Sequence, residues 1–145
     1  MSLTVFDDLG IRFEYPAEWE LEVVDDDGDR ATVMVQSADG LAFAMLTLDA
    51  DRPDPAELAE EALGAMREEY PNLDSRDANE TLDGHHAVGH DVEFLALDIP
   101  NACVIRSFRT PRRSILIFCQ WSDLDDDDMA PAMALLRKSL EETDA

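Results

Sequence analysis

Positive charge is scarce in this sequence. Only 11 of its 145 residues are Lys or Arg, against 34 Asp and Glu, and the net charge is −23. Nucleic acids and anionic membranes are bound through basic patches, so we expect neither as a partner. Molar salt shortens the Debye length to about 3 Å and screens the repulsion between the carboxylates of such an acidic surface. We interpret the composition as adaptation to a salty cytosol; the alternative is a GC-rich genome, which favours Arg, Ala and Asp codons.

Long apolar runs are absent as well. No segment reaches the ~18 apolar residues of a membrane-spanning helix, and the first residues lack the basic and apolar regions of a signal peptide. We therefore predict a cytoplasmic protein without a membrane span. The opening Met1-Ser2-Leu3 resembles a cloning leader, which leaves an export signal further upstream as the alternative.

Cysteine is limited to Cys103 and Cys119, both in apolar segments, where a free thiol behaves as a small hydrophobic group. A tight hairpin turn at Pro111 and Arg112 places Cys103 opposite Gln120, so the two sulfurs point to opposite faces. A looser turn would align them for a cross-strand disulfide, which stays open as the alternative.

The remaining pattern predicts one α+β domain over residues 1–145. Apolar residues alternate with polar ones in several short segments, and residues 41–48, 103–108 and 115–121 are apolar on both faces. A sheet that is buried on both faces needs helices on both sides. We expect a three-layer sandwich in which a mainly antiparallel sheet of about seven strands lies between helices. The predicted strands are residues 11–15, 19–23, 31–36, 41–48, 73–82, 86–97, 103–108 and 115–121.

Two segments have the features of helices. The first begins with Asp54 as N-cap and Pro55 at the first helical position, carries an apolar stripe from Leu58 to Met66, and ends near Tyr70. The second begins close to Asp128. The acidic residues at its start, 125–128, interact favourably with the positive end of the helix dipole. Its apolar face is Met129, Met133, Leu136 and Leu140.

One local motif resembles a known family. A strand that closes in Tyr15-Pro16-x-x-Trp19 and runs directly into a second strand is similar to the opening of PsbP and Mog-type domains. An Asp83-Gly84 turn and the closing helix fit the same fold. The resemblance implies a small α+β domain that mostly binds partners and catalyses nothing. Its known partners, a small GTPase for Mog-type members and a photosystem for PsbP-type members, are not carried over to this acidic chain.

The best candidate for a binding site is a cluster of arginines around one predicted hairpin: Arg106, Arg109, Arg112 and Arg113. They could form an anion pocket or dock an acidic partner. The alternative, which we favour, is that they form ion pairs with the abundant carboxylates. Arg106 and Arg109 lie on opposite faces of the strand, so all four can converge only if the hairpin twists strongly.

Histidines form the second candidate. His86 and His90 share a strand face but lie roughly 13 Å apart, too far for one zinc ion, and His85 points the other way. His90 or His86 could act as a general base, although Asp91 cannot orient its neighbour's ring. The acidic segment 25–29 fails as a calcium loop, because Val23 and Met34 fall where acidic ligands are required.

The favoured function is a non-enzymatic binding or assembly module that uses a groove beside the sheet and a protein partner, as a monomer or homodimer. We expect no cofactor and no metal. The alternatives are a small hydrolase or isomerase with a histidine base, and a cation-binding protein of the acidic loops.

Overall fold

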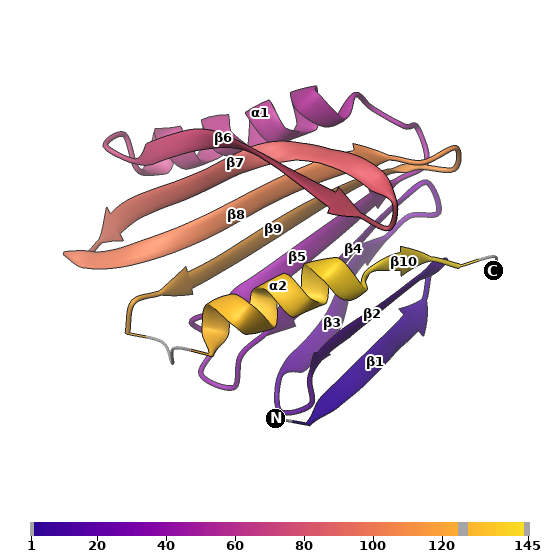
Figure 1. The fold of residues 1–145 in the computed structure, drawn as a ribbon, viewed down its shortest axis with the longest axis horizontal. Helices are drawn as coiled ribbons and strands as arrows, with labels where there is room; N and C mark the ends of the chain where they lie inside the picture. The colour runs from indigo at the N-terminus through magenta and orange to yellow at the C-terminus, as the bar shows by residue number, and fades with distance from the viewer. Residues whose placement is uncertain (1, 125–127, 144–145) are drawn as a thin grey trace.

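The computed structural model describes residues 2–124 and 128–143 and shows an α+β fold (Figure 1). Its elements are, in chain order, β1 (Leu3–Asp8), β2 (Ile11–Pro16), β3 (Glu20–Asp26), β4 (Arg30–Gln36), β5 (Phe43–Asp49), α1 (Pro55–Glu69), β6 (Asp74–Leu82), β7 (His85–Ala96), β8 (Ile99–Arg109), β9 (Ser114–Ser122), α2 (Met129–Ser139) and β10 (Glu141–Glu142).

The main sheet has seven antiparallel strands in the order β3-β4-β5-β9-β8-β7-β6. The predicted strand number and direction are therefore confirmed. Cys103 is paired with Gln120, as the tight turn between β8 and β9 required, and both cysteines are free and buried.

The first predicted strand does not belong to this sheet. Strands β1, β2 and β10 form a separate sheet of three strands, a division that the sequence did not indicate. Alternation in β2 correctly marks Ile11 and Phe13 as buried, but it shows only which side chains turn inward. They are covered by α2, which packs on β2, and they share one apolar cluster with Val33 and Leu46 of β4 and β5 in the main sheet.

The Tyr-Pro-x-x-Trp corner is the point at which the chain changes sheets. Pro16 ends β2, the amide of Trp19 donates to the carbonyl of Pro16 at 3.0 Å, and β3 begins one residue later in the main sheet. Proline suits this position because it has no N–H to give to a further ladder. Trp19 packs against the apolar cluster beneath.

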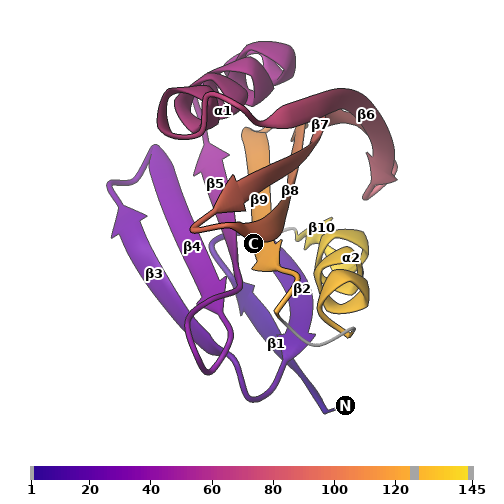
Figure 2. The ribbon, with the colours of Figure 1, turned by 90° about the vertical axis from the view of Figure 1, so that its left-hand side faces the viewer.

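Helix α1 begins as predicted. Asp54 accepts a hydrogen bond from the amide of Glu57 at 3.1 Å, and the helix is closed at Tyr70. The predicted apolar stripe is displaced: the buried residues are Ala59, Leu63 and Met66, whereas Leu58 is half-buried. Helix α1 packs on β7, β8 and β9, and α2 packs on β2 and β9, beside which it is seen in Figure 2.

Helix α2 begins directly after Asp128, whose side chain makes no capping hydrogen bond. The other predicted acidic residues of its start, 125–127, lie outside the described residues. Met133, Leu136 and Leu140 are buried as predicted. Arg137, in the last turn of the helix, is buried with them.

Candidate functional site

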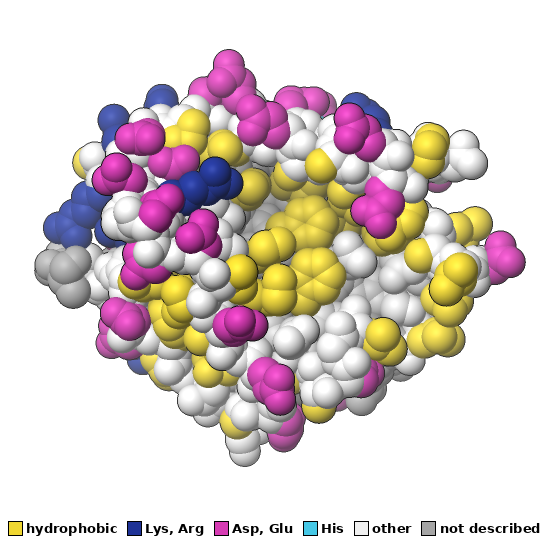
Figure 3. Space-filling model, turned by 180° about the vertical axis from the view of Figure 1, so that it is seen from behind, with side chains coloured by type: hydrophobic (Ala, Val, Ile, Leu, Met, Phe, Trp, Pro, Cys, Tyr) yellow, Lys and Arg dark blue, Asp and Glu magenta, His cyan; other side chains and the backbone are white. Residues whose placement is uncertain are grey.

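A hollow lies beside α1 on the main sheet, with a volume of about 460 Å³. Figure 3 shows hydrophobic side chains gathered in a depression of this surface, with acidic side chains around it. The sheet contributes Phe43, Met45, Thr47, Leu116, Phe118 and Gln120. The helix contributes Ala62, Ala65, Met66, Glu69 and Tyr70.

The hollow exists because α1 covers only part of the sheet. Residues paired directly across antiparallel strands lie on the same face, so each cross-strand row can be followed from one edge of the sheet to the other. One row reads Glu22, Met34, Met45, Phe118, Ile105 and His90. Ile105 and His90, on β8 and β7, are buried, whereas Met34, Met45 and Phe118 are only half-buried.

Residues 41–48 had been expected to form a strand covered on both faces. The strand begins later, at Phe43, and Leu41 is 58% exposed in the preceding turn. One face of β5 is fully buried, but the other, with Phe43 and Met45, lines the hollow. Apolar residues on both faces of a strand thus line an open hollow here as well as a core.

The chemistry of the hollow suits an apolar ligand. The rings of Phe43 and Phe118 are stacked with centroids 5.9 Å apart, and Tyr70 lies against Phe94 at 4.3 Å. Burial raises the pKa of Tyr70, and the charge of Glu69 adds to the shift. Aromatic groups supply a large contact area and methionine adapts to differently shaped partners.

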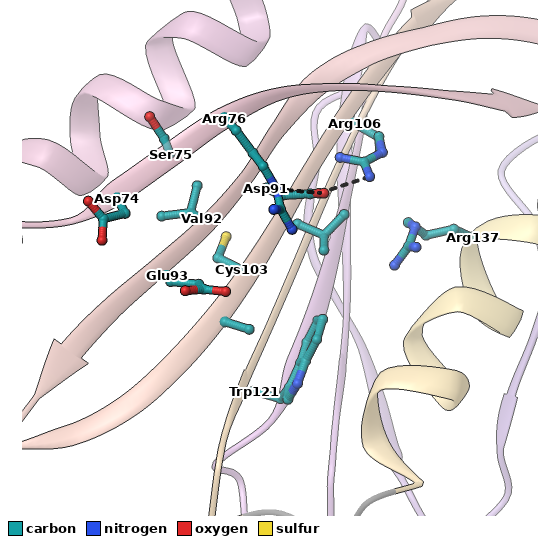
Figure 4. Close-up of a pocket in the computed structure, with 12 residues that line it drawn as sticks. Asp74, Ser75, Arg76, Asp91, Val92, Glu93, Cys103, Arg106, Trp121 and Arg137 are labelled. Atoms are coloured by element: carbon teal, nitrogen blue, oxygen red, sulfur yellow. Dashed lines mark hydrogen bonds and ion pairs between the residues drawn. The ribbon is translucent and has the colours of Figure 1, made fainter.

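A second cavity, which we call the arginine cavity, has a volume of about 380 Å³ and lies between β6, β7, β8 and α2 (Figure 4). Arg106 and Arg137 are buried there with side chains 7% and 8% exposed. Glu80 lies between them, with Oε1 at 3.3 Å from Arg106 Nε and 2.9 Å from Arg137 Nε. Arg106 also donates to Asp91 at 2.9 Å, and among the described residues Nε of Arg106 has no partner with hydrogen-bond geometry.

The four predicted arginines do not converge. Arg106 lines the arginine cavity, whereas the other three lie at the end of the β8–β9 hairpin. Arg109 and Arg112 donate to backbone carbonyls at 3.2 and 2.9 Å, and Arg113 pairs with Glu142 at 3.1 Å. Each cation therefore has a partner within the chain, and their role in binding stays a prediction.

The predicted histidines are also separated. His86 is exposed, whereas His90 is buried beneath α1 on the wall of a small cavity of about 250 Å³. Its Nε2 lies 3.0 Å from Glu60 and its Nδ1 lies 3.3 Å from Asp77. Both ring nitrogens therefore face carboxylates of this chain.

Other candidate chemistry has structural explanations. Asp26 and Asp27 accept backbone hydrogen bonds from Gly28 and Arg30 in the β3–β4 turn. Within residues 2–124 and 128–143, no three His, Cys, Asp or Glu side chains are grouped as metal ligands. No helix in the same residues is both long and apolar enough to cross a membrane. Burial raises the pKa of Cys119 to about 11, which makes this thiol unreactive at neutral pH.

Sequence reasoning missed the hollow and most of the arginine cavity. The apolar second face of residues 41–48 was a usable signal for the hollow. Arg137 and Glu80 gave none, because they are 57 residues apart in the chain and each is typical of an exposed surface.

No protein-family model matches the sequence, and neither does any curated protein. Solved structures do resemble it. The cyanobacterial PsbP (CyanoP) of Synechocystis superposes with a TM-score of 0.69 at 11% identity, over 97% of this chain and 92% of that one. LpqN of Mycobacterium tuberculosis, involved in cell envelope biogenesis, superposes with a TM-score of 0.59 at 16% identity, over 98% and 91%. The fold is therefore PsbP-like, as the corner motif predicted.

Proposed function

We propose that this PsbP-like domain is a non-enzymatic binding or assembly module, which holds an apolar segment of a protein partner in the hollow. The observation that carries the proposal is the stacked pair Phe43 and Phe118, which α1 leaves only half-buried. A contiguous exposed apolar surface is unfavourable in water unless a partner covers it, and such surfaces commonly mark interaction sites.

Charge at the edge of the hollow indicates the chemistry of the partner. Glu69 lines it from α1, and Glu20 and Glu22 are exposed on β3 in the cross-strand rows of Phe43 and Met45. An acidic edge around an apolar centre favours a segment whose apolar side chains are flanked by Lys or Arg. A segment flanked by acidic residues would be repelled.

Peptide binding tests this proposal. The probe is a fluorescein-labelled peptide with four leucines flanked by lysines, and its partner probe replaces every lysine with glutamate. We expect fluorescence anisotropy to show binding of the lysine peptide only. Ala65→Trp fills the hollow from the exposed side of α1 and should weaken binding about ten-fold, a loss of ~1.4 kcal/mol.

Ala56→Trp is the matched control, because Ala56 is also exposed on α1 and lies outside the hollow. Its affinity for the lysine peptide should equal that of the unmodified chain. Absence of lysine-peptide binding would refute the module, and equal binding of the glutamate peptide would refute the role of the acidic edge.

The catalytic and cation-binding alternatives have less support. A histidine base needs a free ring nitrogen, and both nitrogens of His90 face carboxylates. The carboxylates of Asp26 and Asp27 are engaged in their own turn.

We also propose that the acidic surface is an adaptation to a salty cytoplasm. A net charge of −23 with one lysine supports it, because self-repulsion of this size is relieved by salt. Thermal melting should show a Tm that rises with KCl concentration. A Tm that is independent of KCl would leave codon bias as the explanation.

We further infer that α1 and α2 lie on opposite faces of the main sheet. On β9, Leu116 and Phe118 pack with the cluster of α1, whereas Ile117 and Cys119 pack with that of α2. Nuclear Overhauser contacts from Phe118 to α1 and from Ile117 to α2 would support this placement, and contacts from one residue to both helices would contradict it.

A further inference from the structure

One side of the arginine cavity carries uncompensated positive charge. Three guanidinium groups, those of Arg76, Arg106 and Arg137, share two carboxylates. Asp91 lies 2.9 Å from Arg106 and 3.9 Å from Arg76, and Glu80 lies between Arg106 and Arg137. The count leaves one positive charge in excess, and Arg76, whose side chain is 78% exposed, is free to reach a ligand.

The other side carries uncompensated negative charge. Asp74 and Glu93 are directly opposite each other on β6 and β7, an unfavourable arrangement for like charges. Within the described part of the chain neither makes an ion pair closer than 4 Å. Ala102 and Trp121 continue the same row on β8 and β9. The small alanine gives a ligand access to the indole of Trp121, whose ring attracts cations.

The distance between the two charged sides of the cavity follows from the pairing of β6 with β7. Arg76 and Asp91 form one cross-strand pair and Asp74 and Glu93 the pair two residues further along. Two residues of a strand span about 7 Å. Figure 4 shows Asp74 and Glu93 at one end of the cavity, Arg106 and Arg137 at the other, and Trp121 along its wall.

We propose that the arginine cavity binds a small zwitterion, in which a short apolar chain joins a carboxylate to an ammonium group. The carboxylate lies against Arg76 and Arg137, and the ammonium group lies between Glu93 and Trp121. The buried ion pairs of Arg106 and Arg137 hold the cationic side in place before the ligand arrives, so that little side-chain entropy is lost on binding. The cavity volume of about 380 Å³ admits such a molecule. This site is independent of the hollow.

Calorimetric titration of the full chain tests the proposal with 4-aminobutyrate as the probe. Butyrate and butylammonium are the matched ligands, since each keeps one of the two charges. We expect 4-aminobutyrate to bind at least about five-fold more tightly than either, because each charged contact adds about 1 kcal/mol. Its trimethylated form should bind at least as well as 4-aminobutyrate, because a quaternary ammonium group suits an aromatic wall.

Two substitutions locate the site without disturbing buried groups. Arg76→Gln and Glu93→Gln remove exposed charges, and each should weaken 4-aminobutyrate binding about five-fold without lowering Tm. Arg76→Gln should leave the affinity for butylammonium unchanged. Glu68→Gln, an exposed acid on α1, is the control. The proposal is overturned if 4-aminobutyrate does not bind, if butyrate binds equally well, or if neither substitution changes the affinity.

Discussion

Replacing Glu80 with leucine should destabilise this protein more than replacing any exposed acid. Glu80 is 16% exposed and lies between two guanidinium groups that are 7% and 8% exposed. Burial lowers the pKa of Arg137, but the hydrogen bond and charge of Glu80, together with Cys119, outweigh burial and the pKa is raised. Both arginines stay charged in the variant; Arg106 keeps Asp91 at 2.9 Å, whereas Arg137 loses the one carboxylate with which it pairs among the described residues.

Removing one partner of a buried ion pair costs roughly 3–5 kcal/mol, because the remaining charge is left uncompensated. Each kcal/mol lowers Tm by about 2–4 °C in a domain of this size, so we expect a fall of about 10 °C. Urea denaturation followed by circular dichroism gives the free energy of unfolding, and calorimetry gives Tm. Both are measured at high salt, where the acidic surface is screened.

Glu93→Leu is the matched control, because Glu93 is exposed on the adjacent strand, and its cost should be within about 0.5 kcal/mol. The double variant Glu80→Leu, Arg137→Met should recover part of the loss, since it removes the arginine that Glu80→Leu leaves without a carboxylate partner among the described residues. A loss below about 1 kcal/mol for Glu80→Leu would show that water or neighbouring acids compensate both arginines, and would refute the reasoning.

Two further predictions concern the backbone and the thiols. Gly89→Ala should lower the free energy of unfolding, measured by urea denaturation, by at least about 3 kcal/mol, because the added Cβ would overlap the backbone of β8. Gly64→Ala in α1 is the control: the added Cβ meets no described atom within 4 Å, and the substitution should stabilise the protein by ~0.5–1 kcal/mol. Equal effects of the two substitutions would contradict the packing. Burial raises the pKa of Cys119 to about 11 from 9.0, so the unfolded chain loses the thiol proton first and the free energy of unfolding should fall as pH rises from 9 to 11. Cys119→Ser should show a shallower fall, and an unchanged slope would contradict the assignment.

Much of the main sheet could be predicted from local sequence. The register that pairs Cys103 with Gln120 follows from a short turn, and the start of α1 follows from Asp54 and Pro55. These signals act over a few residues and depend little on the rest of the molecule. The PsbP-like fold followed from the corner at Pro16 for the same reason.

The division into two sheets and the position of the hollow could not be predicted. Alternation shows that Ile11 and Phe13 turn inward, but it does not show which surface receives them. The hollow depends on where α1 comes to rest across the strands. Nothing in the helix sequence specifies this lateral position.

The candidate arginines show a similar limit. Their clustering in sequence suggested one site, yet Arg106 lies within β8 whereas Arg112 and Arg113 lie in the turn beyond its end at Arg109. The cationic side of the arginine cavity is completed by Arg137 and Arg76, from α2 and β6, which no spacing in the sequence connects to Arg106.

The three-stranded sheet has a consequence for synthesis on the ribosome. Strand β2 pairs with β10, and Phe13 shares its cluster with Leu136 and Leu140 of the closing helix. Strand β2 is synthesised early, and its apolar face therefore stays exposed until the segment around Glu141 has emerged from the ribosome. We expect stalled chains ending before α2 to bind chaperones at residues 11–16, and release of those chaperones to follow emergence of β10. Emergence of the final strand would then set the time at which the newly made chain becomes safe from aggregation.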